Sequence, residues 1–394
     1  MDRSLEARRV NCCDEYDNVT RFSVTYDHLT HFKLPIDSER QHTAPGLSTT
    51  TIVKHLVTGG SGFLGNLIAR RLLERGEDVT ILDIWEDPSR PKEIKYINCD
   101  IRNRDDVAKA MKGVDIVHHN VALVPLTKSG GKFWEVNVVG SRIAAEEATK
   151  AKVKGFIHMS SSALYGLPPS CPITAETPLN PIEIYGRGKK AGEEAVRGVL
   201  DEEGIPLVVI RPRTILGEGR LGIFQILFEW IKEGRNIYVI GTGNVGFQFV
   251  HAHDLMDFYM LALDADKPGV YNVGTERFGT LREGLENLVK HAETETNVRS
   301  LPEWLTINGL KLADMLHLSP LAPWHYLTYH KEFFFDVQPL VDMGWKPKYS
   351  NDEMFRESYD WFLENFDRVK VEEAASAHRK PVKEALLKVV KWFS

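Results

Sequence analysis

The fold of this chain is decided by nine residues near its beginning, Val57-Thr58-Gly59-Gly60-Ser61-Gly62-Phe63-Leu64-Gly65. An apolar, β-branched run precedes them, and an amphipathic run follows them. Glycines in such a loop permit a sharp turn, a close approach of backbone N–H groups to a pyrophosphate, and tight packing of the helix on the strand. The positive end of the helix then faces the phosphates. In this strand–helix context the loop predicts a dinucleotide site formed by Gly59, Gly62, Phe63, Leu64 and Gly65.

Outward from this loop, residues 51–212 alternate short apolar runs with longer amphipathic ones, which is the pattern of βαβ units. We therefore predict an α/β fold in which a doubly wound, Rossmann-type parallel sheet forms an NAD-binding domain, with some later segments returning to it. The candidate strands are Ile52–Val57, Asp78–Asp83, Ile94–Asn98, Asp115–His119, Gly155–Ser160 and Leu207–Arg211. The candidate helices include Leu64–Arg75, Phe133–Ala151 and Tyr185–Asp201.

The remaining segments differ from this domain. Residues 1–50 are polar and without a sustained period, and they form an N-terminal extension. Residues 213–366 mix helices with short strands such as Ile237–Ile240 and Val270–Val273, and we predict that they form mainly a smaller mixed substrate-binding lobe. Residues 367–394 read as a linker and an amphipathic, basic C-terminal helix. That helix either docks on its own protein or a partner, or makes peripheral contact with a membrane surface.

Composition excludes several classes of protein. The 394 residues are 43% hydrophobic and 26% charged, as in ordinary globular proteins, and the net charge of −6 comes from mixed signs. No basic face suggests a nucleic-acid partner. The four cysteines include no CxxC pair, so neither a disulfide scaffold nor a metal site is expected. Without a signal-peptide pattern or an apolar run long enough to span a bilayer, the sequence predicts a cytoplasmic protein.

The strand after the glycine loop ends in Asp83, where a ribose-binding carboxylate is expected. Such a carboxylate accepts hydrogen bonds from the adenosine hydroxyls and repels a 2′-phosphate, so it favours NAD over NADP. The alternative is that Asp83 merely ends a strand. Further on, Asp100 is predicted to accept from the adenine amino group, with Ile101 beside the ring.

Tyr185 and Lys189 lie four residues apart and therefore on one helix face. A tyrosine with an ordinary pKa near ~10 is a poor base at neutral pH, and a nearby ammonium group lowers that pKa. The pair follows, by about 20 residues, a serine run at the end of the fifth predicted strand, the edge where doubly wound sheets bind ligands. That run is Ser160-Ser161-Ser162-Ala163-Leu164-Tyr165-Gly166.

The glycine loop, the serine run and the Tyr185/Lys189 pair, in this order, resemble the extended short-chain dehydrogenase/reductases, the NAD-dependent epimerase/dehydratase family. The resemblance covers about Ile52–Asn365. It implies an NAD-dependent oxidoreductase in which Tyr185 and Lys189 are catalytic and also contact the cofactor.

Further site residues follow from the resemblance alone. Ser161 matches the catalytic serine; its neighbour Ser162 is the alternative for that role and otherwise a predicted substrate contact. Asn137 matches the asparagine that supports a proton relay. Ala122 borders the cofactor, beside a departure in which Val121 replaces a small residue. Members often dimerise through a helix pair, which implies a homodimer that uses Tyr185–Asp201.

The sequence constrains the identity of the substrate less than it constrains the cofactor. Many epimerases clamp the diphosphate of a nucleotide sugar with an arginine, where this chain has Phe247, and an asparagine of the same site is Thr214 here. Arg213 or Arg220 are the candidates to replace the clamp. We therefore expect a secondary hydroxyl of a nucleotide-diphosphate sugar, with a steroid- or lipid-like alcohol, as in 3β-hydroxysteroid dehydrogenases, as the alternative. A non-catalytic NAD-binding protein is a third hypothesis, disfavoured by the presence of Tyr185 and Lys189.

Overall fold

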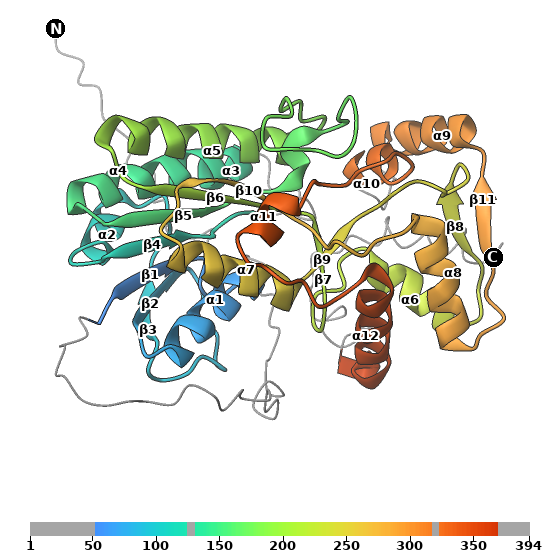
Figure 1. The fold of residues 1–394 in the computed structure, drawn as a ribbon, viewed down its shortest axis with the longest axis horizontal. Helices are drawn as coiled ribbons and strands as arrows, with labels where there is room; N and C mark the ends of the chain where they lie inside the picture. The colour runs from blue at the N-terminus through green and yellow to red at the C-terminus, as the bar shows by residue number, and fades with distance from the viewer. Residues whose placement is uncertain (1–51, 124–130, 317–322, 369–394) are drawn as a thin grey trace, which may run out of the picture.

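The computed structural model describes residues 52–123, 131–316 and 323–368, and Figure 1 shows them as two halves side by side. The predictions for residues 1–50 and for the C-terminal helix lie outside these ranges. The sheet half contains β1 (Lys54–Thr58), α1 (Phe63–Glu74), β2 (Asp78–Asp83), β3 (Lys95–Asn98), α2 (Arg104–Ala110), β4 (Ile116–His119), α3 (Gly131–Trp134), the π-helical segment η2 (Glu135–Gly140), α4 (Ser141–Ala151), β5 (Gly155–Met159), the 3-10 turn η3 (Ser162–Tyr165), α5 (Ile184–Glu203), β6 (Leu207–Pro212), α7 (Ala252–Asp264) and β10 (Gly269–Val273).

Seven parallel strands form the central sheet in the order β10-β6-β5-β4-β1-β2-β3. This confirms the doubly wound Rossmann-type fold and all six predicted strands, with shifts of one or two residues at their ends. The strand predicted at Val270–Val273 is the seventh strand of this sheet, paired with β6, and not part of the substrate lobe. The order reverses between β1 and β4, so a ligand crevice is expected at the carboxyl ends of these strands.

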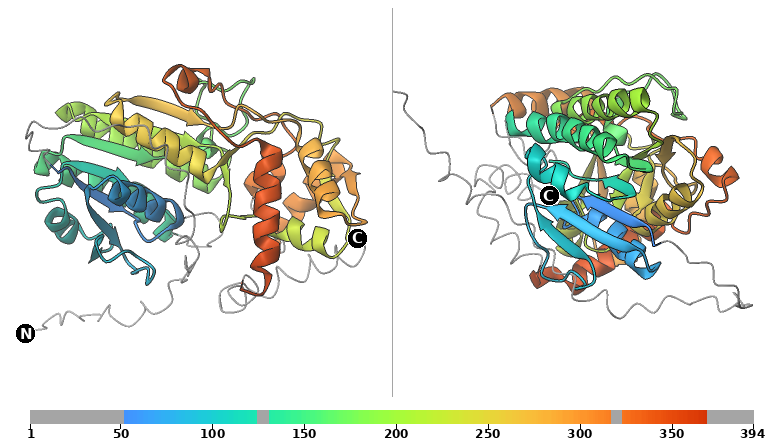
Figure 2. Two further views of the ribbon diagram at one scale, coloured as in Figure 1. Left: turned by 60° about the horizontal axis from the view of Figure 1, so that its bottom comes forward. Right: turned by 90° about the vertical axis from the view of Figure 1, so that its left-hand side faces the viewer.

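Helices cover both faces of the sheet. In Figures 1 and 2, α4 and α5 lie over one face, and α1 and α7 over the other. Successive strand residues point to opposite faces. In β1, Leu56 accordingly packs in the core under α4, and Val57 in the core that continues under α1 and α7 into the second half. Both side chains are completely buried.

The helix predicted over Phe133–Ala151 is not continuous. It consists of α3, the π-helical segment η2 and α4, so the backbone widens where Asn137 lies. Helix α5 presses on this place, because a Cβ atom on Gly192 would lie 2.3 Å from the Asn137 carbonyl oxygen. Wide turns of this kind are frequent at functional sites, and the apolar period of the sequence does not reveal them.

The second half packs around aromatic rings. Phe224, Phe228, Phe249 and Phe355 are fully buried in one cluster. The elements of this half are β7 (Thr214–Leu216), α6 (Phe224–Lys232), β8 (Ile237–Ile240), β9 (Phe249–His251), α8 (Leu281–Ala292), β11 (Val298–Leu301), α9 (Glu303–Met315), α10 (Pro323–Thr328) and α12 (Asn351–Glu364). The short helix α11 (Gln338–Asp342) lies nearer the sheet half, beside α7 and β10 in Figure 1. Strands β7 and β9 pair with each other, as do β8 and β11.

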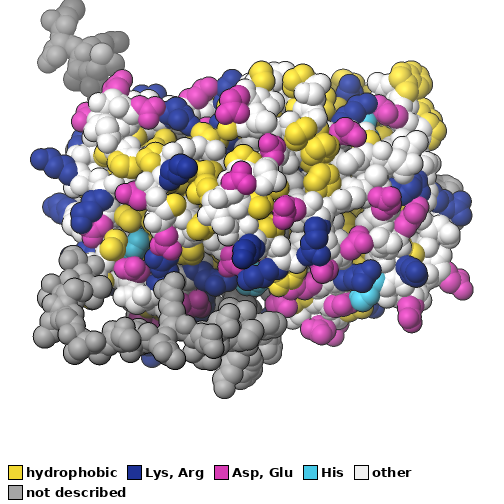
Figure 3. Space-filling model, in the orientation of Figure 1, with side chains coloured by type: hydrophobic (Ala, Val, Ile, Leu, Met, Phe, Trp, Pro, Cys, Tyr) yellow, Lys and Arg dark blue, Asp and Glu magenta, His cyan; other side chains and the backbone are white. Residues whose placement is uncertain are grey.

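The face shown in Figure 3 is mixed in charge, and hydrophobic side chains are exposed on α9. Trp304, Leu305, Leu312 and Met315 are all more than half exposed on α9, where hydrophobic side chains gather in Figure 3. Among the described residues, no helix is both long and apolar enough to cross a membrane.

Candidate active site

The glycine loop has the backbone geometry of a phosphate cradle. Gly59 has a φ of +68°, a conformation that side chains disfavour. A Cβ atom on Gly65 would lie 2.1 Å from the Gly59 carbonyl oxygen, so α1 packs directly on the turn. Gly62 caps α1 without a side-chain hydrogen bond, and no acidic residue lies in the first turn. The start of α1, with Phe63 and Leu64, therefore fits a pyrophosphate.

Asp83 lies beside this loop, as predicted. Its carboxylate accepts hydrogen bonds from the backbone N–H groups of Ser61, at 3.1 Å, and Trp85, at 3.4 Å. Burial raises the pKa of Asp83, and these backbone hydrogen bonds oppose that rise. The carboxylate thus braces the glycine loop while ending β2 at the position suited to a ribose.

The predicted adenine contacts are less well placed. The Asp100 carboxylate receives hydrogen bonds from the Arg102 guanidinium, at 2.6 Å for Nη2, and these outweigh burial and lower its pKa. Ile101 is only 3% exposed and packs against Gly140. This packing does not favour the expected contact between Ile101 and adenine. Ala122 is partly exposed just after β4, on the side of the cleft.

Helix α5 brings Tyr185 to the end of β5. Glu183 caps the helix by accepting hydrogen bonds from the backbone N–H groups of Tyr185, at 2.7 Å, and Gly186, at 2.6 Å. A Cβ atom on Gly186 would lie 2.5 Å from the Ala163 carbonyl oxygen, and one on Gly188 would lie 2.8 Å from the Phe133 ring. Because glycine stands at these positions, α5 lies directly on the serine turn.

Tyr185 and Ser161 form a hydrogen-bonded pair. Burial raises the pKa of the Tyr185 phenol, whereas the Ser161 hydrogen bond and the Arg220 charge lower it. Ser162 is buried instead, and its hydroxyl accepts a hydrogen bond from Arg213 at 3.2 Å. Of the two neighbouring serines, the geometry therefore supports Ser161 as the partner of the tyrosine and places Ser162 away from a substrate.

Lys189 lies one turn beyond Tyr185 but is turned inward. Its ammonium group donates to the Met159 carbonyl oxygen at 2.9 Å. Burial lowers the Lys189 pKa to about 8, against the opposing charge of Glu193. In this conformation the Lys189 ammonium is engaged by the Met159 carbonyl, and the charges that shift the Tyr185 pKa include Arg220 and Glu183.

Asn137 braces the segment after β4. Its side-chain oxygen accepts from the Leu123 N–H at 2.8 Å, and its side-chain nitrogen donates to the Leu123 carbonyl at 3.0 Å. The Asn137 carbonyl oxygen accepts from the Ser141 hydroxyl at 2.8 Å. Both amide functions are thus used in holding the backbone, and a proton relay through Asn137 stays a prediction.

The predicted substrate residues do not line an open cleft. Arg213 is 1% exposed, and its guanidinium lies 4.8 Å from the Phe247 ring centroid and 4.1 Å from that of Phe333. Phe247 is fully buried. Thr214 hydrogen-bonds the partly buried Tyr329. The three positions form part of one aromatic box beneath the site.

Sequence reasoning missed a buried polar network behind Tyr185. The Glu193 carboxylate accepts hydrogen bonds from Arg211, at 3.0 Å for Nε, and from Ser160 at 2.7 Å. Arg211 also donates to Tyr165, whose hydroxyl donates to Asn272 at 2.8 Å. The only signal in the sequence was the spacing of Glu193, four residues after Lys189.

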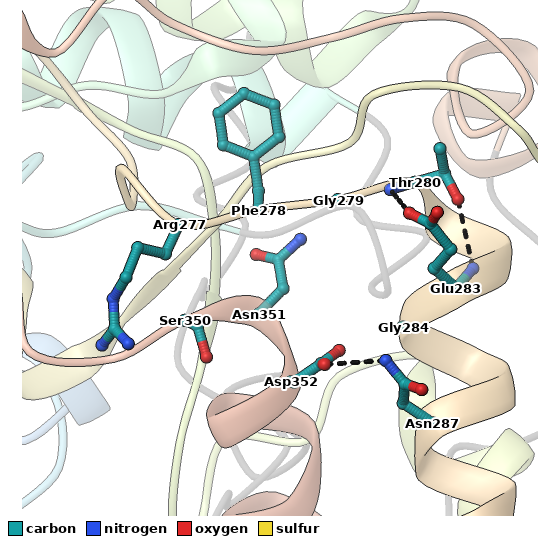
Figure 4. Close-up of a pocket in the computed structure, with 10 residues that line it drawn as sticks. All are labelled: Arg277, Phe278, Gly279, Thr280, Glu283, Gly284, Asn287, Ser350, Asn351 and Asp352. Carbon is teal, nitrogen blue, oxygen red and sulfur yellow. Dashed lines mark hydrogen bonds between the residues drawn. The ribbon is translucent and has the colours of Figure 1, made fainter.

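A separate hollow lies between α8 and α12 in the second half (Figure 4). Both helix N-termini there are already capped: Thr280 and Glu283 exchange backbone hydrogen bonds, and so do Ser350 and Glu353. These capping boxes use the N-cap and N3 backbone N–H groups of both helices, and the hollow contains none of the residues predicted for the chemistry.

Comparisons with known proteins agree with this geometry. Residues 55–274 match the family model of the NAD dependent epimerase/dehydratase family. The chain is 40% identical to an uncharacterized protein of Sinorhizobium fredii, over 84% of each chain. It is 30% identical to a UDP-glucose 4-epimerase of Lactobacillus helveticus, over 78% of this chain and 97% of that one. It is also 25% identical to a 3-beta-hydroxysteroid dehydrogenase of Mycolicibacterium neoaurum, over 83% and 96%.

The fold is shared with a solved UDP-glucose 4-epimerase of Thermotoga maritima, with a TM-score of 0.65 and 21% identity over 80% of this chain and all of that one. Because the family model covers more than half of the chain, the chain belongs to the NAD dependent epimerase/dehydratase family. This confirms the resemblance, the enzymatic nature of the protein and NAD as its cofactor.

Proposed function

We propose that this protein oxidises a secondary hydroxyl of a nucleotide-diphosphate sugar and returns the hydride after inversion or elimination. The hydrogen-bonded Tyr185–Ser161 pair at the carboxyl end of β5 carries the proposal. It stands at the edge of the sheet where the glycine loop faces a dinucleotide. The epimerases and dehydratases among the relatives support the sugar as substrate.

In this proposal the Ser161 hydroxyl orients the substrate oxygen, and Tyr185 takes its proton and later returns it. NAD supplies the acceptor for the hydride and then its donor. Lys189 lies within one helical turn of the tyrosine and is suited to hold the nicotinamide ribose after leaving the Met159 carbonyl. Buried surroundings keep the Tyr185 pKa high, so nearby positive charge is needed for it to act as a base at neutral pH.

One observation favours a second candidate, a 3β-hydroxysteroid-type dehydrogenase for a steroid- or lipid-like alcohol. Phe247 stands where many epimerases carry the diphosphate-binding arginine, and it is fully buried among aromatic rings. A hydroxysteroid dehydrogenase is also among the relatives. This candidate requires NAD to be exchanged in each cycle, whereas the sugar reaction retains it.

The test begins with mass spectrometry of the purified protein. Retained NAD, together with conversion of UDP-glucose or dTDP-glucose followed by proton NMR, is expected. Exchangeable NAD with no sugar conversion, but with NADH production from a 3β-hydroxysteroid, would replace the first candidate by the second.

The Tyr185→Phe variant checks the chemical assignment. It removes the proton-transferring hydroxyl but keeps the ring, so turnover is expected to fall by about 10²–10⁴-fold. NAD affinity, measured by calorimetry, should change little. Undiminished turnover would remove Tyr185 from the mechanism.

We also propose that the protein forms a homodimer through α5, which lies beside α4 on the outer layer in Figure 1. Light scattering coupled to size exclusion would show twice the monomer mass. A monomer at micromolar concentration would contradict it.

A further inference from the structure

Arg213 and Arg220 are the two candidates to replace the missing diphosphate-binding arginine. The structure shows that their surroundings differ. Arg213 Nε donates to the Gln248 carbonyl oxygen at 2.9 Å, and the guanidinium is enclosed by Phe247, Phe333 and Phe335. With 1% of its surface exposed, Arg213 cannot meet a ligand without opening this aromatic box. Arg220, only seven residues later, is exposed.

Arg220 lies beside the start of α1, which follows the glycine loop. Its guanidinium carbon is 5.7 Å from the centroid of the Phe63 ring. Phe63 is the first residue of α1, whose N-terminus faces the predicted pyrophosphate. The same guanidinium acts on the Tyr185 phenol and lowers its pKa. The Arg220 guanidinium is therefore close enough to act electrostatically on both the predicted pyrophosphate position and the Tyr185 phenol.

The loop that carries Arg220 is built to fix its place. Gly217, Gly219 and Gly222 all have positive φ values, between 54° and 141°, so the loop folds tightly after β7. The Arg220 N–H donates to the Gly217 carbonyl oxygen at 3.0 Å. The next residue, Leu221, is 5% exposed and packs in the main core. These contacts fix the backbone at Arg220, whose exposed side chain reaches the Phe63 ring.

We propose that Arg220 binds phosphate oxygens of a diphosphate that lies between Phe63 and Tyr185. Arginine suits this chemistry because its planar guanidinium donates two parallel, charge-assisted hydrogen bonds to phosphate. The diphosphate belongs either to NAD or to a nucleotide sugar. The second source rests on the proposed function, and the first does not.

Calorimetric titration of the full chain with NAD and, separately, with UDP tests the proposal. Arg220→Gln removes the charge and keeps the length, and Arg235→Gln, another exposed arginine of the second half, is the matched control. We expect Arg220→Gln to weaken one of the two ligands by about ten- to a hundredfold, as for a lost charged hydrogen bond. Arg235→Gln should leave both affinities unchanged.

The two titrations distinguish the sources of the diphosphate. Selective loss of NAD affinity assigns Arg220 to the cofactor, and selective loss of UDP affinity assigns it to the substrate. Equal affinities in wild type and Arg220→Gln for both ligands would overturn the inference. If wild type binds no UDP but Arg220→Gln loses NAD affinity, the inference stands and the sugar function fails.

A spectroscopic readout is independent of turnover. The ultraviolet absorbance of tyrosinate, taken as the difference between each protein and its Tyr185→Phe form, reports the phenol directly. Arg220 is the positive group acting on that phenol, Glu183 is the negative one, and Lys189 is turned toward Met159. Arg220→Gln should therefore shift the titration to higher pH, and an unchanged midpoint would count against a guanidinium at this place.

Discussion

Arg211 and Arg213 lie two residues apart and are both buried, but their surroundings differ. Arg211, in the sheet half, is 4% exposed and pairs with both oxygens of Glu193. Arg213, where the second half begins, is 1% exposed and has aromatic rings around it. Among the described residues no carboxylate pairs with it, and its Nη2 atom has no hydrogen-bond partner.

The surroundings of Arg211 and Arg213 show two ways in which this protein buries a positive charge. In the sheet half, Arg211 is buried together with its counter-ion Glu193, since a buried charge is tolerated when it is paired and hydrogen-bonded. The second half places an uncompensated cation on the faces of aromatic rings, an arrangement of lower electrostatic gain. Burial accordingly lowers the pKa of Arg213 to about 9, while the pKa of Arg211 rises through Glu193.

The largest effect is expected from breaking the sheet-half pair. Glu193→Leu leaves the Arg211 guanidinium buried without its counter-ion, which costs about 3–5 kcal/mol in the free energy of unfolding. Chemical denaturation followed by circular dichroism measures this loss. Glu194→Leu, at the exposed neighbouring position, is the control. A loss below about 1 kcal/mol in Glu193→Leu would show that the network is not essential to stability.

Features set by local sequence could be predicted, whereas features set by contacts between distant segments could not. The glycine loop, the six predicted strands and the serine run near Tyr185 depend on backbone turns and local spacing, which the sequence displays. The inward turn of Lys189 depends on a carbonyl 30 residues away. The enclosure of Arg213 depends on Phe333, which no local pattern links to it.

Asn137 shows the same limit within the sheet half. The sequence predicts one helix over Phe133–Ala151, but its segment η2 is π-helical and wider where the Gly192 backbone approaches. A long-range feature, the absence of a Cβ at Gly192, thus lets another helix approach the turn around this site residue. Such a cause is invisible until the two helices are placed together.

The second-largest effect is expected in the stability of the protein at acid pH, because the sheet half contains buried histidines. His55 and His118 share a buried hydrogen bond of 2.8 Å, and His118 bonds Tyr259 at 2.7 Å. Burial lowers the pKa of His55 to about 4 and also lowers that of His118. The unfolded chain therefore binds more protons between pH 6.5 and 4, so stability is complete above this window and falls as the pH drops through it.

Each such imidazole removes about 1.4 kcal/mol of stability per pH unit within that window. Melting temperatures measured from pH 7 to pH 4.5 follow the loss. His55→Gln keeps a hydrogen-bonding side chain but does not titrate, so its acid dependence should be shallower than that of wild type. Parallel curves for the two proteins would locate the acid sensitivity elsewhere.

The smallest effect is expected at Arg213, and it tests the comparison most directly. Arg213→Met removes the donors to the Gln248 carbonyl and the Ser162 hydroxyl, a cost of about 1–2 kcal/mol. It also removes a desolvated, unpaired charge and leaves a flexible apolar chain among the rings, which offsets that cost. The net change should lie within about 1 kcal/mol, whereas Arg211→Met, which strands Glu193, should lose about 3–5 kcal/mol in the same urea titration. If the Arg213 variant were the less stable of the two, the aromatic box would hold its cation more firmly than a carboxylate does.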